Sequence, residues 1–210
     1  TYGTNSHLKA LYEEALAVED VVGLVIGTRP DCINDDLLDY FEELNQRTFL
    51  IVEYGVETCN DATLRLINRG HDFDCAKQAI ECTASRGIRV GAHIILGLPG
   101  EDENESLRQA PVISSLPLTT LKIHQMQIIR GTKLAKMYEE HPFHLYSVDE
   151  YIHLIAEYIS RLRADLILER FVSQSPPELL IAPKWGLKNY EFTHRLNNYM
   201  KEHCTKKKEI

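Results

Sequence analysis

Side chains that could bind an anion follow the first apolar run of the sequence. Residues 21–27 are apolar and lead into Thr28, Arg29, Pro30 and Asp31. A proline biases the residue before it toward an extended backbone, which would hold the Arg29 guanidinium at the end of a strand. A guanidinium there suits a carboxylate or a phosphate. The alternative is that Arg29 closes the turn by contacting Asp31.

Two glutamates and an arginine follow the second run, residues 48–55. Glu53 and Glu57 interrupt the apolar pattern, and a carboxylate at a strand end can accept hydrogen bonds from ribose hydroxyls. Each could equally be a solvated loop charge. Arg69 closes a short helix-like segment, where it could bind an anion or complement the helix dipole.

A histidine and two glycines mark the end of the third run, residues 88–96. His93 lies near its carboxyl end, and Gly97 and Gly100 form the turn after it. Glycines without a Cβ atom allow the backbone to approach a ligand closely. The spacing fits neither GxGxxG nor a P-loop, so neither of those phosphate-binding mechanisms is supported.

The fourth run, residues 120–129, contains His124 and Gln127. His124 is either a hydrogen-bonded interior histidine or a catalytic one. The sequence has no GxSxG, no HExxH and no cysteine beside an evident base, so no hydrolytic site is recognisable. Acid-base chemistry by Glu53, Glu57 and His93 remains open as an alternative.

The elements that would position these side chains alternate along the chain. Five β-branched-rich runs predict strands: residues 21–27, 48–55, 88–96, 120–129 and 166–172. The first three are almost continuously apolar, as in strands buried on both faces. Segments of helical period separate the runs, with caps expected at Ser6, Asn34, Asp72 and Ser147, a proline (Pro111) inside residues 103–115, and a final helix over residues 188–201.

This order predicts right-handed βαβ units and a parallel α/β sheet, either a barrel or a doubly wound sheet. Ligands in both folds gather at the carboxyl ends of the strands, where the residues above lie. We expect one domain over residues 1–175 and a carboxy-terminal extension over residues 176–210, with the break at Pro176 and Pro177.

The composition excludes several classes of protein. A chain of 210 residues that is 44% hydrophobic can bury a real core, and its net charge of −8 offers no overall attraction for a polyanion. No apolar run is long enough to span a bilayer and no signal peptide opens the chain, so a cytoplasmic location is expected. Five scattered cysteines predict free thiols.

Taken in order, the strand-end phrases resemble a known family. They are similar to the middle and later barrel of radical S-adenosylmethionine (SAM) enzymes. The phrases are GTRPD, VEYGVET with LRLINRGHD, HIILGLPGE and LKIHQMQIIRGTKLAKMY. The most similar group is bacterial and uncharacterised, and it resembles the radical SAM domain of the elongator acetyltransferase that modifies tRNA. The resemblance covers about residues 1–185 and implies a partial parallel (β/α) barrel.

The resemblance also implies a chemistry and its residues. In such enzymes a 4Fe-4S cluster held by CxxxCxxC cleaves SAM to methionine and a 5′-deoxyadenosyl radical. Arg69 corresponds to the residue that pairs with the SAM carboxylate, and Glu57 and His93 to ribose-contacting positions that usually hold other residues. The turn from Gly97 to Gly100 would border the adenine. Thr28 and Arg29 would line the same open end of the barrel. His124 and Gln127 would face the substrate.

The CxxxCxxC motif is absent from the printed sequence, so the resemblance implies a piece of a longer protein whose cluster ligands precede residue 1. We expect this piece to hold no metal and to be inactive, and the full-length protein to need an electron donor protein. The substrate is unknown, with RNA a candidate. A barrel without its first strands would expose an edge, through which we expect dimerisation. The competing hypotheses are the acid-base enzyme and a non-catalytic binding scaffold.

Overall fold

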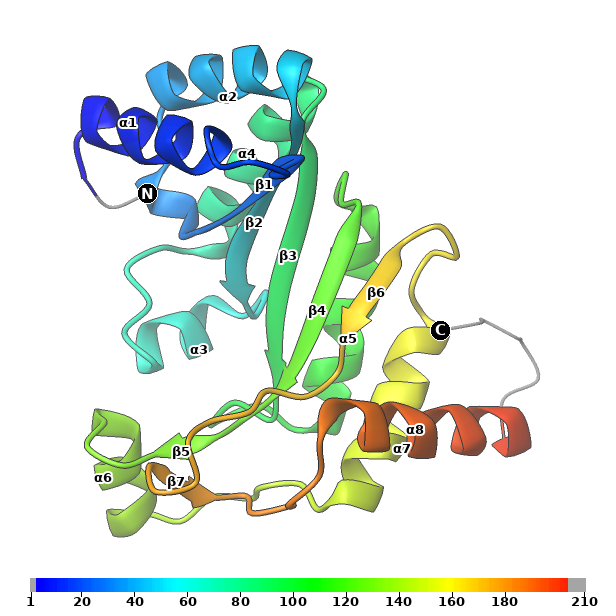
Figure 1. Cartoon of the computed structure of the whole chain (residues 1–210). Coiled ribbons are helices and arrows are strands. Elements are labelled where there is room, and N and C mark those ends of the chain that lie inside the picture. The colour runs from blue at the N-terminus through cyan, green and yellow to red at the C-terminus, as the bar shows by residue number, and fades with distance from the viewer. Residues whose placement is uncertain (1–2, 204–210) are drawn as a thin grey trace.

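Five parallel strands form the main sheet of this computed structural model, which describes residues 3–203 (Figure 1). Their order across the sheet is β1-β2-β3-β4-β6, so each βα unit adds the next strand at the same edge. A second sheet pairs β5 with β7 in antiparallel fashion. The strands are Gly23–Thr28 (β1), Phe49–Glu57 (β2), Arg89–Leu96 (β3), Thr120–Gln125 (β4), Ile128–Ile129 (β5), Ile167–Arg170 (β6) and Leu180–Ala182 (β7).

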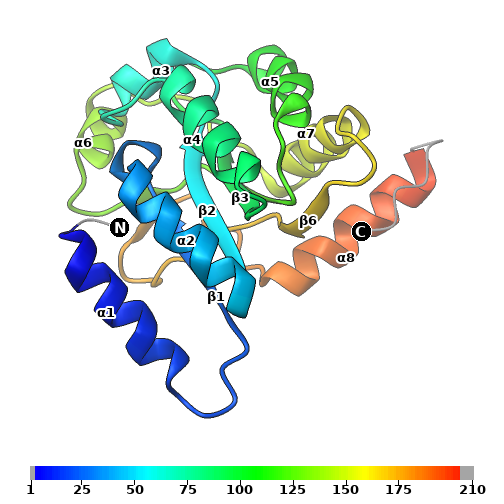
Figure 2. The same cartoon turned by 90° about the horizontal axis from the view of Figure 1, so that it is seen from above.

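Helices cover one face of the main sheet, and the other face carries no helix across β2, β3 and β4 (Figures 1 and 2). Helices α2, α4, α5 and α7 form the layer, while α1 lies beside α2 and α8 packs on α7. The helices are Asn5–Leu16 (α1), Pro30–Cys32 (the 3-10 turn η1), Asp35–Arg47 (α2), Asp61–Leu66 (α3), Phe73–Ser85 (α4), Glu103–Ser115 (α5), Lys133–Glu140 (α6), Val148–Ser160 (α7) and Asn189–His203 (α8).

The core lies between the sheet and this helical layer. Leu50, Val52, Tyr54 and Val56 alternate along β2 and are fully buried, which is the pattern of side chains that point to one face. The intervening positions point to the open face and include Glu53. The parallel α/β sheet thus has one apolar face covered by helices and one open face that carries polar side chains.

Strand β1 departs from the expectation that the first three strands are buried on both faces. Within β1 only Ile26 is buried, and Val25 is 57% exposed. The expectation was wrong for β1 because this strand is at the edge of the sheet and pairs only with β2 among the described strands. Residues 1 and 2, which the family resemblance assigns to the preceding strand, lie outside the described part.

The predicted run 120–129 is not one strand. It ends as β4 at Gln125, and Ile128 and Ile129 join a separate sheet with β7, which no sequence pattern predicted. Helix α6 was also missed. The cap predicted at Ser6 is instead Thr4, whereas the caps at Asn34 and Asp72 and the capping box at Ser147 are confirmed.

Two further predictions concern the carboxy-terminal helix and the cysteines. Phe192, Leu196 and Met200 of α8 are buried in the main core, as their helical spacing predicts, and Trp185 stacks on Phe192. Cys32, Cys59, Cys75 and Cys82 are free thiols, and Cys204 lies outside the described residues. No helix within residues 3–203 is long and apolar enough to cross a membrane.

Candidate functional site on the interior face of the sheet

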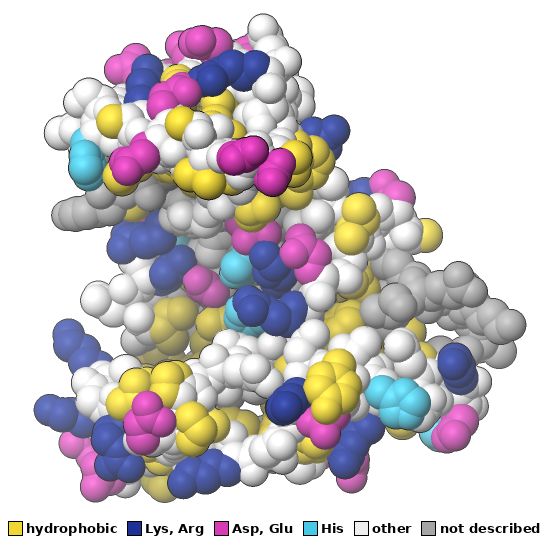
Figure 3. Space-filling view, in the orientation of Figure 1, with side chains coloured by type: hydrophobic (Ala, Val, Ile, Leu, Met, Phe, Trp, Pro, Cys, Tyr) yellow, Lys and Arg dark blue, Asp and Glu magenta, His cyan; other side chains and the backbone are white. Residues whose placement is uncertain are grey.

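Charged and histidine side chains gather on the open face of the sheet. In the space-filling view they occupy the hollow middle of the molecule, between the layer that contains α1 and α2 and the part that contains α6 and α8 (Figure 3). The carboxyl ends of parallel strands meet along this side, where α/β proteins bind their ligands. The predicted site residues of β2, β3 and β4 all belong to this region or its rim.

Arg69 and Glu57 form an ion pair at the carboxyl end of β2. The Arg69 Nη2 atom lies 2.9 Å from Glu57 Oε1 and also donates to the Gly55 carbonyl oxygen at 2.9 Å. The guanidinium therefore turns back to the strand instead of complementing the end of α3. Its Nε atom is buried and has no hydrogen-bond partner. A donor of this kind is available to an anionic ligand.

Local backbone geometry positions this pair. The pairing of β2 with β3 shifts register between Gly55 and Glu57, and Glu57 has a left-handed φ of 68°. Bulges of this kind redirect a side chain near functional sites, and a left-handed glutamate is uncommon. Gly55 leaves room for the pair, because a Cβ atom there would come within 2.5 Å of Arg69 Nη2 and 2.7 Å of Glu57 Oε1 and would displace the ends of both side chains.

Burial of Glu57 raises its pKa, although the positive charge of Arg69 opposes the rise. The side chain is mostly covered, with 16% exposed. A carboxyl group held this way can accept a hydrogen bond from a ligand hydroxyl, and it becomes a donor when protonated. This arrangement suits the ribose contact that the family resemblance implies for Glu57.

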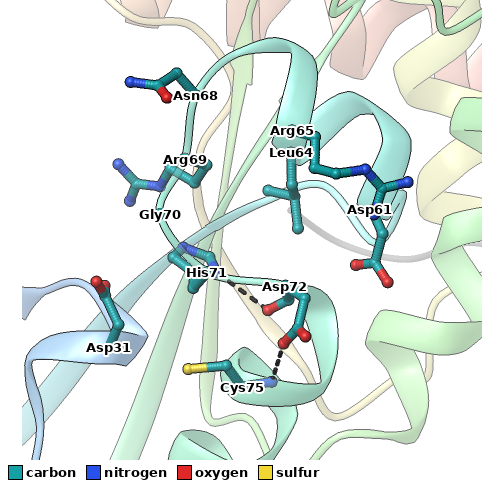
Figure 4. Close-up of a pocket in the computed structure, with 10 residues that line it drawn as sticks. All are labelled: Asp31, Asp61, Leu64, Arg65, Asn68, Arg69, Gly70, His71, Asp72 and Cys75. Carbon is teal, nitrogen blue, oxygen red and sulfur yellow. Dashed lines mark hydrogen bonds between the residues drawn. The ribbon is translucent and has the colours of Figure 1, made fainter.

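A pocket of about 610 Å³ opens beside the pair (Figure 4). Arg69, Gly70 and His71 follow one another along the loop after α3, and Cys75 on the first turn of α4 lies nearby. His71 Nδ1 donates to the Asp72 carbonyl oxygen at 3.1 Å, since a carbonyl can only accept, and its Nε2 is buried without a partner. The remaining lining residues are Asp31, Asp61, Leu64, Arg65 and Asn68.

A second group of charges lies on β2, β3, β4 and β6. Glu53 accepts from His93 Nε2 at 2.9 Å and pairs with Lys122, which also contacts Glu169 at 3.3 Å. The hydrogen bond from His93, helped by Lys122, lowers the pKa of Glu53 to about 2. So low a pKa makes Glu53 a weak base at neutral pH. Glu57 pairs with Arg69 instead, so the three residues of the acid-base alternative do not form one catalytic set.

The two substrate-side candidates lie in different surroundings. His124 Nε2 accepts a hydrogen bond from Arg170 Nη2 at 3.1 Å, and the His93 and His124 ring centroids are 5.6 Å apart. Gln127 instead bonds Ser173 and Ser175 and lines a separate pocket of about 560 Å³ between the end of β4 and the chain after β6. His124 is thus half-buried and hydrogen-bonded on the open face.

The remaining predicted residues line the rim. Arg29 is held by Asp31, with Nε to Oδ1 at 2.9 Å, which is the turn-closing contact given as the alternative above. Thr28 Oγ1 donates to the Arg29 carbonyl oxygen at 3.2 Å. Gly97 and Gly100 both have left-handed φ values, and a Cβ atom at Gly97 would lie 3.0 Å from the Tyr146 ring.

The sequence did not single out several residues that organise the site. Glu101 accepts from Thr58 at 2.5 Å and from Gln109 at 3.0 Å, which ties the loop after β2 to the loop after β3. Burial raises the pKa of Glu101. Lys122 and Arg170 were also missed, although Lys122 alternates with His124 along its strand, a signal that could have placed both on one face.

The described residues suit the two groups that the family resemblance implies, SAM and an iron-sulfur cluster, to different degrees. The orphaned Arg69 Nε, the buried Glu57 and the adjoining pocket could receive the carboxylate and a hydroxyl of SAM. By contrast, within residues 3–203 no three His, Cys, Asp or Glu side chains are grouped to hold a metal ion. The part of the chain that the structure describes therefore has a donor and a pocket that suit a carboxylate, and it has no grouped set of metal ligands.

Comparisons with known proteins agree with this architecture. YtqA of Bacillus subtilis (strain 168) is 38% identical over 92% of this chain and 62% of its own length. The tRNA uridine(34) acetyltransferase of Methanocaldococcus jannaschii is 26% identical over 88% of this chain and 34% of its own. The solved archaeal Methanocaldococcus infernus Elp3, with residues 1–46 deleted, has a TM-score of 0.75 at 23% identity, covering 86% of this chain and 42% of that one.

The chain thus spans about three fifths of the length of YtqA. Two family models match it in succession. The radical SAM C-terminal domain matches residues 118–202, and the radical SAM superfamily matches residues 1–108, just over half of the chain. The family expected from the strand-end phrases is confirmed: the chain belongs to the radical SAM superfamily.

Proposed function

We propose that this chain is the later part of a radical SAM enzyme that, at full length, cleaves SAM reductively and acts on an unknown substrate. RNA is the candidate substrate, because the chain is similar to a tRNA uridine(34) acetyltransferase. The net charge of −8 gives no overall attraction for RNA, so such contact would be local or lie in the rest of the protein. The observation that carries the proposal is the Arg69–Glu57 pair at the mouth of a radical SAM barrel.

The described side chains would bind and orient SAM. Arg69 would receive the SAM carboxylate through its Nε atom, a charge-assisted contact that arginine makes well. Glu57 and His93 would take the ribose, and the turn from Gly97 to Gly100 would border the adenine, with Thr28 and Arg29 on the rim.

A 4Fe-4S cluster would supply the electron for the one-electron cleavage of SAM to methionine and a 5′-deoxyadenosyl radical. Its ligands would come from the part of the protein that precedes this chain, as would the docking surface for an electron donor protein. The chain alone would then position SAM without cleaving it, and we expect the 210-residue piece to be inactive.

A binding measurement tests the role of Arg69. In the anaerobically prepared full-length protein, we expect R69Q to weaken SAM binding about tenfold or more, since it removes a charge-assisted hydrogen bond. R195Q is the matched control, because Arg195 is an exposed arginine on α8 that does not line the pocket. Calorimetry on both variants decides the matter. Equal SAM affinity in R69Q and the wild type would contradict the assignment.

A further inference from the structure

Arg170 reaches the interior face through an irregularity in β6. Leu121 pairs with Leu168, yet the next pair is Lys122 with Arg170, so β6 has one more residue than β4 at this point. A bulge lets two consecutive side chains approach one side of a sheet. Glu169 accordingly contacts Lys122, and Arg170 contacts His124, both on the open face.

The two cations on this face, Lys122 and Arg170, differ in their carboxylate partners. Lys122 is paired with two carboxylates, Glu53 and Glu169. Arg170 has no carboxylate partner among the described residues; its Nη2 donates to an imidazole, and its Nε is buried with no partner. A guanidinium does not lose its proton, and a partly buried cation without a counter-charge is unfavourable. An anionic group beside the unpartnered Arg170 Nε would therefore be favourable.

His124 orients the Arg170 guanidinium. A guanidinium can only donate, so His124 Nε2 must accept and the ring proton must be on Nδ1. Burial first, then the positive charge of Arg170, lowers the pKa of His124 to about 4. The ring is therefore neutral near pH 7 and accepts the Arg170 hydrogen bond at Nε2, which fixes the direction of the guanidinium.

We infer that Arg170, oriented by His124, forms an oxyanion site that holds a phosphoryl or carboxylate group of the substrate. Both residues are near the carboxyl ends of neighbouring strands, on the face that also carries Glu57 and Arg69. An anionic group anchored at β4 and β6 would leave the rest of the substrate over β2 and β3, toward the proposed SAM position. The assignment to substrate rests on the proposed function, whereas binding of an oxyanion does not.

The probes are inorganic phosphate and acetate, titrated into the full-length protein without SAM and followed by ¹H–¹⁵N NMR of the histidine rings. The H124Q variant assigns the His124 resonances. We expect one of the two anions to shift them saturably and to raise the pKa of His124, because a bound anion offsets the charge of Arg170. Binding of phosphate identifies a phosphoryl group as the ligand, and binding of acetate alone identifies a carboxylate.

Variants separate this site from general charge effects. R170Q should weaken anion binding about tenfold or more, and R170K, which keeps the charge but loses the planar fork, should weaken it less. R195Q, on the exposed side of α8, should bind as the wild type does. Lack of a saturable shift with either anion would overturn the inference, as would displacement of the anion by SAM, which would place these residues in the SAM site. Neither outcome depends on the R69Q result.

Discussion

At the scale of single residues, the interior face separates two kinds of charged group. Arg69 and Glu57 hold each other at the end of β2, while Glu53, His93, Lys122 and Glu169 form a continuous set of ion pairs across four strands. The first group retains an unsatisfied donor and borders a pocket, which are the properties of a binding site. The second joins the polar faces of the strands, with Glu53 and Glu169 both paired to Lys122.

His124 gives a prediction about acid stability. In an unfolded chain a histidine titrates near pH 6.5, whereas the pKa of His124 in the fold is about 4. Between these values the unfolded state binds a proton that the folded state does not, so stability present above about pH 6.5 is lost as the pH falls toward 4. Between pH 6.5 and pH 4 we expect the free energy of unfolding of H124Q to fall by about 1 to 2 kcal/mol less than that of the wild type, after allowance for solvent screening.

Urea unfolding at several pH values measures this difference. H141Q is the control, because His141 is an exposed histidine at the end of α6, and its pH profile should follow that of the wild type. If the wild type and H124Q lose equal free energy of unfolding between pH 7 and pH 4, the described surroundings of His124 are wrong.

At the scale of elements, local signals in the sequence predicted the βα units, and long-range contacts explain what was missed. The caps at Asn34, Asp72 and Ser147 depend on residues three apart, so the sequence reveals them directly. Strands β5 and β7 have two and three residues and pair with each other across about 50 residues of sequence. Neither is long enough to show an alternating pattern in the sequence. The bulge that brings Arg170 to the open face likewise exists only in the paired sheet.

Within the site, too, the sequence predicted single residues but not the long-range contacts between them. Arg69 and Glu57 were predicted as binding residues from their places after a strand and a helix, yet their contact with each other needs the bend of β2 between Gly55 and Glu57. Lys122 escaped notice because a lysine within an apolar run has meaning only once its two glutamate partners, from β2 and β6, are known.

The bend of β2 can be tested by adding one methyl group. G55A would place a Cβ atom 2.5 Å from Arg69 Nη2, so we expect the ends of Arg69 and Glu57 to move apart and SAM affinity in the full-length protein to fall. G27A is the matched control, since a Cβ atom at Gly27 on β1 meets nothing within 4 Å. Calorimetry that shows the same SAM affinity for both variants would argue against a positioning role for Gly55.

At the scale of the whole molecule, the open edge of the sheet is the main structural liability. Strand β1 pairs only with β2 within residues 3–203, and Val22 and Val25 are 83% and 57% exposed. An exposed apolar edge strand can pair with another chain. We therefore expect the 210-residue chain to dimerise through β1, as judged by size-exclusion chromatography with light scattering.

A charge on the edge should prevent this association. V25K is expected to shift the chain to a monomer, because a lysine on an edge strand opposes pairing. V112K, at an exposed position on α5, should leave the oligomeric state unchanged. A clean monomer from the wild-type chain would count against dimerisation through this edge.

The central claim concerns the chemistry of the full-length protein, and one measurement tests it most directly. The full-length protein, reconstituted anaerobically with iron and sulfide, is incubated with SAM and a reductant, and 5′-deoxyadenosine is quantified. A radical SAM enzyme with Arg69 on the SAM carboxylate predicts 5′-deoxyadenosine above the background without protein, and about tenfold less from R69Q at SAM concentrations below saturation. No 5′-deoxyadenosine from the reconstituted wild type, with or without candidate RNA, would contradict the proposed function.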